Sequence, residues 1–483
     1  MTDANIPALC SIDEFLKRDY DFIVVGGGTA GLVVAARLTE NANVNVGILE
    51  AGPANIGDPM ILTPAMYSKA IGNPKYDWLH KSVPQKSASN FAIDQPRGKG
   101  LGGSSAINYQ MYVRGHQLDY DDWEKLGNKG WGFKDLLPYF TKHEHFDDPS
   151  GYSTKPNIPL ETCMMPVAME RMGQSIQVSV LGDLHKRESG LLLRAHWILA
   201  TAFGYELVEG EKSLDMLQDE SELQAAMALY ATKKSGPLSS GGAAVGFISY
   251  ADLCTPSEMK ELQELILTDK NTGHDDATKK IIADSVADHD YGSIQLVLLA
   301  ATLDLRDPGS QVALLQPPPE QLGKHGLALA ACLARPLSMG TIHITSSDPE
   351  IDPQIDPGYL THPAGVELLT KGLQLLEKIT ATSPFKEKIK GRHHPVELDV
   401  GDKKSTEEYL RKTCETEYHP IGTVAMGKKG VGAVDYRLKV WGAKGVRVVD
   451  ASVMPLHVSG NIVSTVYAIA EKASDLIKED WEL

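Results

Sequence analysis

A histidine near the C-terminal end of the chain has the sequence context of a catalytic base. His419 lies in the segment YHPIGT, residues 418–423, directly before a proline. The residue before a proline is biased toward extended backbone, which suits a ring that is presented to a ligand. Neutral imidazole takes up protons near neutral pH, so His419 is our candidate general base. A buried structural histidine is the alternative, and the neighbouring Pro, Gly and Thr favour catalysis.

A second polar residue, Asn461, opens a C-terminal segment with helical periodicity. The apolar positions of this segment share one helix face: Val463, Val466, Tyr467, Ala470 and Ile477. Because Asn is a favoured N-cap, we predict a helix that begins at Asn461. Its positive end would face the group ahead of it, which suits a flavin that becomes negative on reduction. We also predict a short strand over residues 446–449.

The element that would position a cofactor is clearest near the N-terminus. The pattern predicts a strand, a helix and a second strand over residues 22–25, 29–40 and 44–49. Gly26, Gly28 and Gly31 have the G-x-G-x-x-G spacing, which permits a tight turn, the approach of a pyrophosphate and close helix packing. Glu50 ends the second strand, where a carboxylate can bind a ribose 2′-hydroxyl and would repel a 2′-phosphate. This arrangement favours FAD or NAD over NADP, whereas a plain glycine turn is the alternative.

A second glycine-rich segment follows at residues 97–115, RGKGLGGSSAINYQMYVRG. Its backbone N–H groups are not obstructed by large side chains, so such a loop can wrap an anion or a flat ring. A flexible surface loop is the alternative interpretation. The presence of the first glycine motif favours cofactor binding.

Composition excludes several classes of protein. The chain has 483 residues with 47 Lys and Arg against 63 Asp and Glu, a net charge of −16, which disfavours nucleic acid and anionic membranes as partners. Its five cysteines form no CxxC motif, and its paired histidines have no acidic or cysteine residues at ligand spacing, so we expect no metal. There is no signal-like N-terminus and no membrane-length apolar run. We expect a cytoplasmic protein with a small-molecule substrate, and a homodimer is one option for its assembly.

Several of these segments resemble the glucose-methanol-choline (GMC) oxidoreductases, FAD-dependent enzymes that oxidise alcohols. The first glycine motif is similar to the start of that family's FAD-binding domain, and GKGLGGSSAINYQMYVRG resembles its first signature. The later segments YHPIGTVAMG and VRVVDASVMPLHVSGNIVSTVYAIAEKASDLI resemble its catalytic and C-terminal parts. The resemblance covers residues 18–147 and about 207–483.

The resemblance implies a mixed α/β fold, with a Rossmann-like FAD-binding domain and a substrate domain of antiparallel sheet and helices. We expect the FAD-binding domain at residues 1–149 and 425–483, and the substrate domain at 150–424. By position, His419 would be the base that removes a hydroxyl proton while hydride passes to flavin N5, and Asn461 would be the second active-site residue. The resemblance implies cofactor contacts at these positions: Gly26, Gly28, Thr29, Ala30, Gly31, Glu50, Arg97, Gly102, Gly103, Ser104, Asn108, Asp450, Ala451, Asn461 and Ile462.

One segment departs from the family pattern. Residues 150–206 are much shorter than the corresponding part of family members, which contains further sheet strands, contacts to the adenine end of FAD and a second signature. The FAD-binding domain is therefore expected to be truncated. Either residues 150–206 rebuild that wall, or a partner or second copy covers it, or FAD is not bound. The last alternative would leave a non-redox enzyme, such as a cyclase or dehydratase, or a pseudoenzyme.

Overall fold

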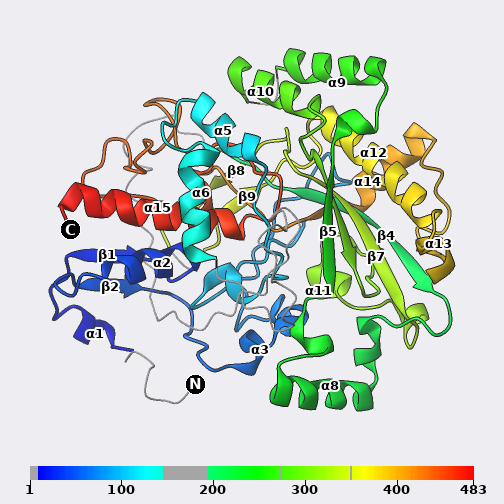
Figure 1. The fold of residues 1–483 in the computed structure, drawn as a ribbon, viewed down its shortest axis with the longest axis horizontal. Helices are drawn as coiled ribbons and strands as arrows, with labels where there is room; N and C mark the ends of the chain where they lie inside the picture. Colours follow the sequence, from blue (N-terminus) through cyan, green and yellow to red (C-terminus); the bar gives the residue numbers. More distant parts are fainter. Residues whose placement is uncertain (1–8, 145–193, 271–272, 349–350) are drawn as a thin grey trace, which may run out of the picture.

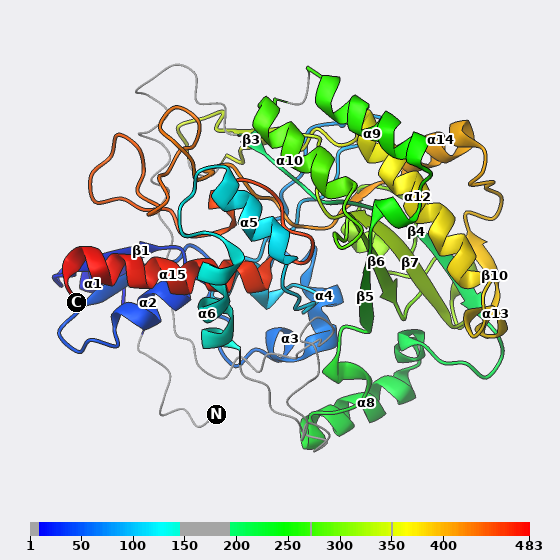
Figure 2. The ribbon, with the colours of Figure 1, turned by 45° about the horizontal axis from the view of Figure 1, so that its top comes forward.

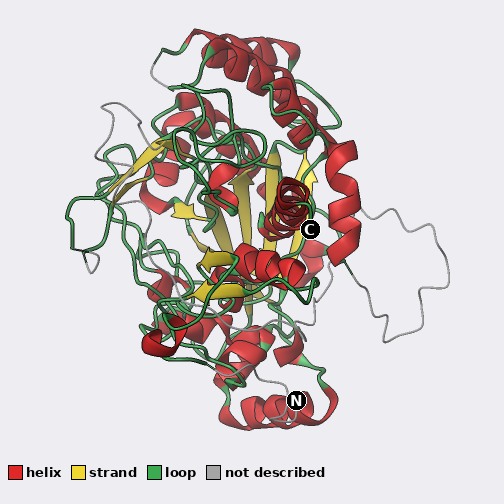
Figure 3. Ribbon diagram, turned by 90° about the vertical axis from the view of Figure 1, so that its left-hand side faces the viewer, coloured by secondary structure: helices red, strands yellow, loops and turns green. Residues whose placement is uncertain are grey.

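The computed structural model describes residues 9–144, 194–270, 273–348 and 351–483. Figure 1 shows a small β unit at the left, with the C-terminal helix running above it, and a larger sheet at the right. Figure 3 shows the strands of the larger sheet in the middle of the molecule, with helices around them. The architecture is mixed α/β, as the sequence predicts.

The N-terminal part forms the expected β-α-β unit. Strands β1 (Phe22–Val25) and β2 (Val46–Leu49) pair in parallel and are connected by α2 (Thr29–Leu38). The helix and the second strand are each two residues shorter than predicted, because a turn closed by Val44 N and Asn41 O separates them. Within the described ranges no third strand joins this sheet. The Rossmann-like unit is therefore truncated in the part of the chain that the structure describes.

The C-terminal helix α15 (Val463–Trp481) packs against α2 and α6 (Phe133–His143). It begins two residues later than predicted, and its N-cap is Ile462 rather than Asn461. Asn461 does not cap the helix because its side chain accepts a hydrogen bond from another part of the fold. The predicted strand 446–449 is also wrong: it contributes only an isolated bridge at Arg447, since the surrounding chain runs through tight turns.

The larger sheet has six strands among the described residues. Its order is β10-β4-β7-β6-β5, and β11 pairs with β4 beside β10. The bounds are β4 (Leu199–Leu207), β5 (Ala243–Ile248), β6 (Ile294–Leu299), β7 (Gly326–Leu333), β10 (Ile389–His394) and β11 (Glu415–Thr416). The last residues of the atypical segment 150–206 form most of strand β4. Residues 150–193 of this segment lie outside the described residues.

Alternate side chains of strand β7 lie on opposite faces of the larger sheet. Leu329, Ala331 and Leu333 belong to the main core, and α12 (Pro363–Thr380) packs against this face; a Cβ on Gly372 of α12 would lie 2.7 Å from Ala331 Cβ. Cys332 belongs to a separate apolar cluster with Met111, which comes from the second glycine-rich segment. Because successive strand residues face opposite sides, one face carries the structural core while the other meets this segment.

The remaining elements lie around these units (Figure 2). A three-stranded sheet has the order β3 (Arg194–Ala195), β8 (Gly340–His343) and β9 (Gln354–Asp356). The longer helices are α5 (Gln117–Lys125), α8 (Glu220–Lys233), α9 (Pro256–Thr268), α10 (Asp276–Val286) and α14 (Lys403–Thr413). The short helices are α1 (Ile12–Phe15), α3 (Pro59–Leu62), α4 (Tyr67–Ala70), α11 (Gln311–Leu314) and α13 (Phe385–Lys388). None of the helices in the described ranges has the length and apolar character needed to cross a membrane.

Candidate active site

The two glycine-rich segments meet at the N-terminus of α2. Gly28 forms a bridge with Gly102, and a Cβ on Gly103 would lie 2.8 Å from the Cα of Gly28. Gly26 and Gly102 have φ angles of +99° and +88°, a region that favours glycine. A Cβ on Gly31 would lie 1.9 Å from the carbonyl O of Gly26, so only glycine lets the helix start this close to the turn. The structure thus brings the predicted glycines together.

This glycine cradle fits a dinucleotide. Among the residues that the structure describes, no side chain caps the start of α2 at Gly28, which leaves the N–H groups of Thr29 and Ala30 in its first turn available to an anion. The buried carboxylate of Glu50 accepts hydrogen bonds from Gly27 N at 2.9 Å and Gly52 N at 2.8 Å, which holds it beside the cradle. A pyrophosphate at the helix end and a ribose near Glu50 match this arrangement.

Three other predicted cofactor residues hold the second glycine-rich segment in shape. Arg97 donates hydrogen bonds to the carbonyl oxygens of Pro96 and Tyr418, and burial lowers its pKa to about 10. Ser104 Oγ accepts from Gly98 N at 3.2 Å, and Asn108 Oδ1 accepts from a backbone N–H two residues later at 3.0 Å. Arg97 therefore connects this segment to the residue that precedes His419, a link that the sequence did not indicate.

His419 is a partly buried base candidate whose ring stays neutral. Its side chain is 15% exposed, and Nδ1 lies 3.9 Å from Glu417 Oε2. Burial, and then the neighbouring His457 and Arg97, hold the pKa of His419 well below its usual range. His457 Nε2 lies 3.2 Å from the carbonyl O of His419, within hydrogen-bond distance. A ring that stays neutral at physiological pH can accept a proton there.

The backbone directly before His419 is held by two hydrogen bonds at Tyr418. Tyr418 has a φ angle of +66°, which is unusual for a residue other than glycine. Its N–H donates to Thr416 Oγ1 at 3.0 Å, and its carbonyl O accepts from Arg97. Such strained backbone persists only where the surroundings hold it, and it concentrates at functional sites.

Asn461 is buried and accepts a hydrogen bond from Gln295 Nε2 at 3.2 Å. Gln295 lies in β6 and is fully buried, and sequence reasoning missed it. Its signal was present in the sequence, since a glutamine interrupts the otherwise apolar strand IQLVLL. Among the described residues no hydrogen bond joins the side chains of His419 and Asn461, so their pairing remains a prediction.

The loop that carries Asn461 is fixed by a buried ionic cluster, which the sequence also did not reveal. Ser459 donates to Asp119 Oδ2 from its backbone N at 2.8 Å and its hydroxyl at 2.7 Å. Arg335 donates to Asp119 Oδ1 at 2.8 Å and to Asp122 Oδ2 at 2.7 Å. This Asp119–Arg335 cluster ties together α5, the end of β7 and the Asn461 loop.

Two of the three remaining predicted positions, Asp450 and Ala451, form a turn next to the His419 segment. Asp450 is exposed and caps a short 3₁₀ turn at Ala451–Val453, with its carboxylate accepting from Ser452 N at 2.8 Å. The carbonyl O of Ser452 accepts from Val424 N at 3.0 Å, so the turn lies beside the loop after His419. Ile462, which follows Asn461, is buried.

An apolar cluster lies between the second glycine-rich segment and the sheet. Its buried members come from four separate segments: Met111, Ile198, Val297 and Cys332. Glu417 N donates to Ile198 O at 3.1 Å, which places the His419 segment at the edge of this cluster. An apolar lining beside a few polar groups is typical of a site for a small organic molecule.

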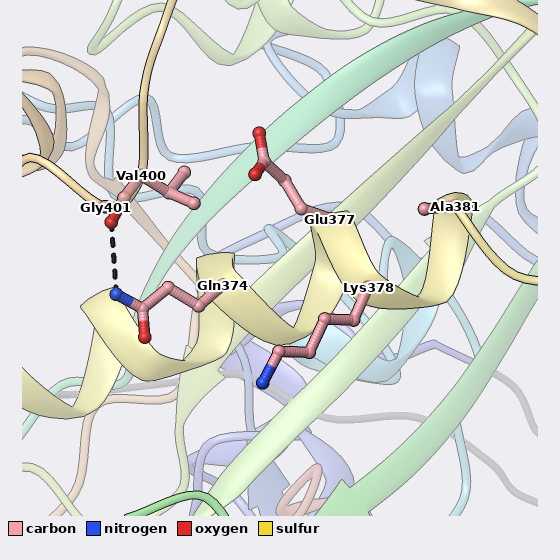
Figure 4. A pocket seen from close by; sticks show the side chains of 6 residues that line it. All are labelled: Gln374, Glu377, Lys378, Ala381, Val400 and Gly401. Atoms are coloured by element: carbon pink, nitrogen blue, oxygen red, sulfur yellow. Dashed lines mark hydrogen bonds between the residues drawn. The ribbon is translucent and has the colours of Figure 1, made fainter.

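A shallow hollow elsewhere on the surface lies apart from the polar groups of the candidate site. It is lined by residues of α12 and by Val400 and Gly401, and Gln374 donates to the carbonyl O of Val400 at 3.1 Å (Figure 4). None of its lining residues belongs to the candidate site. Among the described residues no group of His, Cys, Asp and Glu has metal-binding geometry.

Comparisons with known proteins connect this site to a family. Family models described as GMC oxidoreductase match residues 20–207 and 336–470. The dehydrogenase mpl7 of Monascus purpureus is 28% identical, covering 98% of each chain. The alcohol dehydrogenase [acceptor] of Pseudomonas putida is also 28% identical, covering 95% of each chain.

Solved structures show the same fold. A mutant formate oxidase of Aspergillus oryzae has a TM-score of 0.78 at 23% identity, covering 96% of this chain and 98% of the other. A FAD-dependent oxidoreductase from Chaetomium thermophilum has a TM-score of 0.76 at 21% identity, covering 96% of this chain and 100% of the other.

The comparison with mpl7 also confirms that this chain is short. The alignment spans 616 positions, whereas the chain has 483 residues, so at least 133 positions of the alignment lack a residue here. Even so, both family models match, and they cover the glycine cradle as well as the His419 and Asn461 segments. The chain belongs to the GMC oxidoreductase family.

Proposed function

We propose that the protein is a FAD-dependent enzyme that oxidises the hydroxyl group of a small organic alcohol, with His419 as the general base. The observation that carries the proposal is the partly buried, neutral imidazole of His419, whose preceding residue Tyr418 is bound by Arg97 of the second glycine-rich segment. FAD, when bound, supplies the acceptor for the hydride that leaves the carbinol carbon. His419 takes the hydroxyl proton, and the apolar cluster around Met111 and Cys332 excludes water from the reacting alcohol.

The roles of the other residues follow from their positions. The first turn of α2 would hold the pyrophosphate of FAD, and Glu50 its ribose. Asn461, oriented by Gln295, would be the second polar group that contacts the reacting oxygen. We also propose the domain division stated above, with the FAD-binding domain at 1–149 and 425–483 and the substrate domain at 150–424.

The relatives supply the choice of test alcohols. One is named alcohol dehydrogenase [acceptor], another oxygen-dependent choline dehydrogenase, and one structure is described as an aryl-alcohol oxidase. The test panel therefore contains a linear primary alcohol, benzyl alcohol and choline.

The first experiment is the visible absorption spectrum of the purified protein, before and after incubation with FAD. We expect a flavin band that bleaches anaerobically when a panel alcohol is added. H419N should keep the band but bleach at least about 10²-fold more slowly, because it lacks the base. Bleaching of H419N at the parental rate would remove His419 from this role.

A non-redox reaction is the second candidate, and the short sheet favours it. If the missing positions prevent flavin turnover, the same site would carry out a proton-transfer reaction such as cyclisation or dehydration. In that case product would form under anaerobic conditions without bleaching of the flavin. Obligatory flavin reduction during turnover would exclude this candidate.

A further inference from the structure

Glu417 lies beside His419, and the Cys332 thiol can donate a weak hydrogen bond to it. Both of its carboxyl oxygens, and Nδ1 of His419, are buried and have no N–H or O–H partner among the described residues. Buried polar atoms without partners are rare in folded proteins and costly, so three such atoms side by side call for an explanation. The shortest separation between the two groups is 3.9 Å, from Glu417 Oε2 to Nδ1.

The surroundings of the pair favour the neutral form of both groups. Burial raises the pKa of Glu417 to about 8, so the carboxyl is largely protonated at neutral pH. The Cys332 thiol from β7 also faces Glu417, and burial raises its pKa well above the usual range, so it stays neutral. On the other side, His457 and Arg97 disfavour a positive charge on His419. Catalytic hydrogen bonds are often long before a ligand binds and shorten in the complex.

The tautomer of His419 decides whether it can act as a base. A protonated Glu417 can donate to Nδ1, which would leave the proton on Nε2 and block that nitrogen as an acceptor. An ionised Glu417 can only accept, so it holds the ring proton on Nδ1 and leaves Nε2 free. The same carboxylate would then offset the charge of the imidazolium that forms when Nε2 takes a proton.

We propose that Glu417 is a positioning residue for His419: its carboxylate holds the proton on Nδ1, so that Nε2 can take the hydroxyl proton of the substrate. In this step the substrate O–H bond breaks, an Nε2–H bond forms, and the Nδ1 proton stays in place. The hydride leaves to FAD as in the proposed function, on which this inference rests. The proton later leaves Nε2 to water, which restores the base.

The test compares anaerobic flavin reduction by benzyl alcohol, or by the fastest alcohol of the panel, between about pH 6 and pH 10. The parent enzyme should become faster as pH rises through about 8, a macroscopic pKa that belongs to the pair. E417Q should be about 10- to 100-fold slower at pH 9, the same range as the loss of a carboxylate that orients a metal-bound histidine. It should also lack the rise near pH 8.

E415Q is the matched control. Glu415 is two residues away, equally buried, and burial raises its pKa to about 8, but it faces Gly309 and Gln311 instead of His419. E415Q should therefore keep the rise near pH 8. The inference would be overturned if E417Q reduced its flavin at the parental rate with the same rise near pH 8. It would also be overturned if E415Q lost this rise while E417Q kept it.

H419N separates this inference from the proposed function. If H419N is fast, the base assignment fails; if H419N is slow while E417Q matches the parent, only the role of Glu417 fails. A second measurement needs no substrate: NMR of the holoenzyme with ¹⁵N-labelled histidine, with the His419 signal assigned from H419N. In the parent, the His419 proton should sit on Nδ1 above about pH 8. An Nε2-protonated ring at pH 9 would contradict the inference, even if E417Q does not fold.

Discussion

At the scale of single residues, the site depends on groups that act through His419 as much as on His419 itself. Arg97 was expected at the cofactor because of its place in the family signature. Its guanidinium instead donates to the carbonyl O of Tyr418, a residue with a left-handed backbone. A contact of Arg97 with the cofactor stays a prediction, whereas its link to the base segment is seen. Residue type and spacing do not reveal such a link, because it joins positions 321 residues apart.

The buried carboxyl of Glu415 makes stability depend on pH. Because folding raises its pKa from an ordinary 4.5 to about 8, the stabilisation that it contributes is full below about pH 4.5 and is lost as pH rises through 8. We therefore expect the parent Tm to fall between about pH 6 and pH 9, and E415Q to show a smaller fall. Some decline should remain, since Glu417 acts in the same direction. Parallel Tm curves for the two proteins would contradict this prediction.

At the scale of elements, local patterns were predictable and partners in space were not. The first strand lies where the sequence predicts it, and the glycine turn has the expected form because steric exclusion at Gly31 is local. The start of the C-terminal helix was misplaced because Asn461, a good N-cap by type, is bound by Gln295 from a distant strand. The strand 446–449 failed for a related reason, since an apolar run becomes a strand only where another extended segment pairs with it.

The packing of α2 against α15 depends on an ion pair that the sequence does not reveal. Arg37 contacts Glu471 through Nε at 2.7 Å and Nη2 at 2.7 Å, and Glu471 is 1% exposed. R37M should lower the free energy of unfolding by about 1–3 kcal/mol, measured from urea midpoints. This is less than the roughly 3–5 kcal/mol of a fully buried pair, because Lys142 remains 3.1 Å from Glu471.

Arg306 provides the control for this prediction. It pairs with Asp304 and Glu320 on the surface, so R306M should change the free energy of unfolding by less than about 1 kcal/mol. Equal losses in R37M and R306M would show that the helix pair does not depend on its buried carboxylate.

At the scale of the whole molecule, buried polar contacts among the described residues help to join the two proposed domains. The Asp119–Arg335 cluster is the clearest of these contacts. Arg335 follows the central strand β7, whereas Asp119 lies in α5, directly after the second glycine-rich segment. Ser459 lies two residues before Asn461. The FAD-binding part shares one hydrophobic core with the substrate part, since Val33 and Phe140 belong to the same buried cluster as Leu373. It should therefore depend on the substrate part for its stability.

This dependence can be tested with R335M, which leaves the carboxylate of Asp119 buried without its cation, while Asp122 keeps Lys125 at 2.8 Å. Loss of one partner of a buried ion pair costs about 3–5 kcal/mol, so the urea midpoint should fall. In the parent, release of flavin fluorescence and loss of far-UV circular dichroism should coincide on heating, as expected for one cooperative unit. In R335M the flavin should leave first, because the loop that carries Asn461 is no longer tied to β7. Coincident transitions in both proteins would show that the two parts are held together by apolar packing, and the cluster would then serve only to place Asn461.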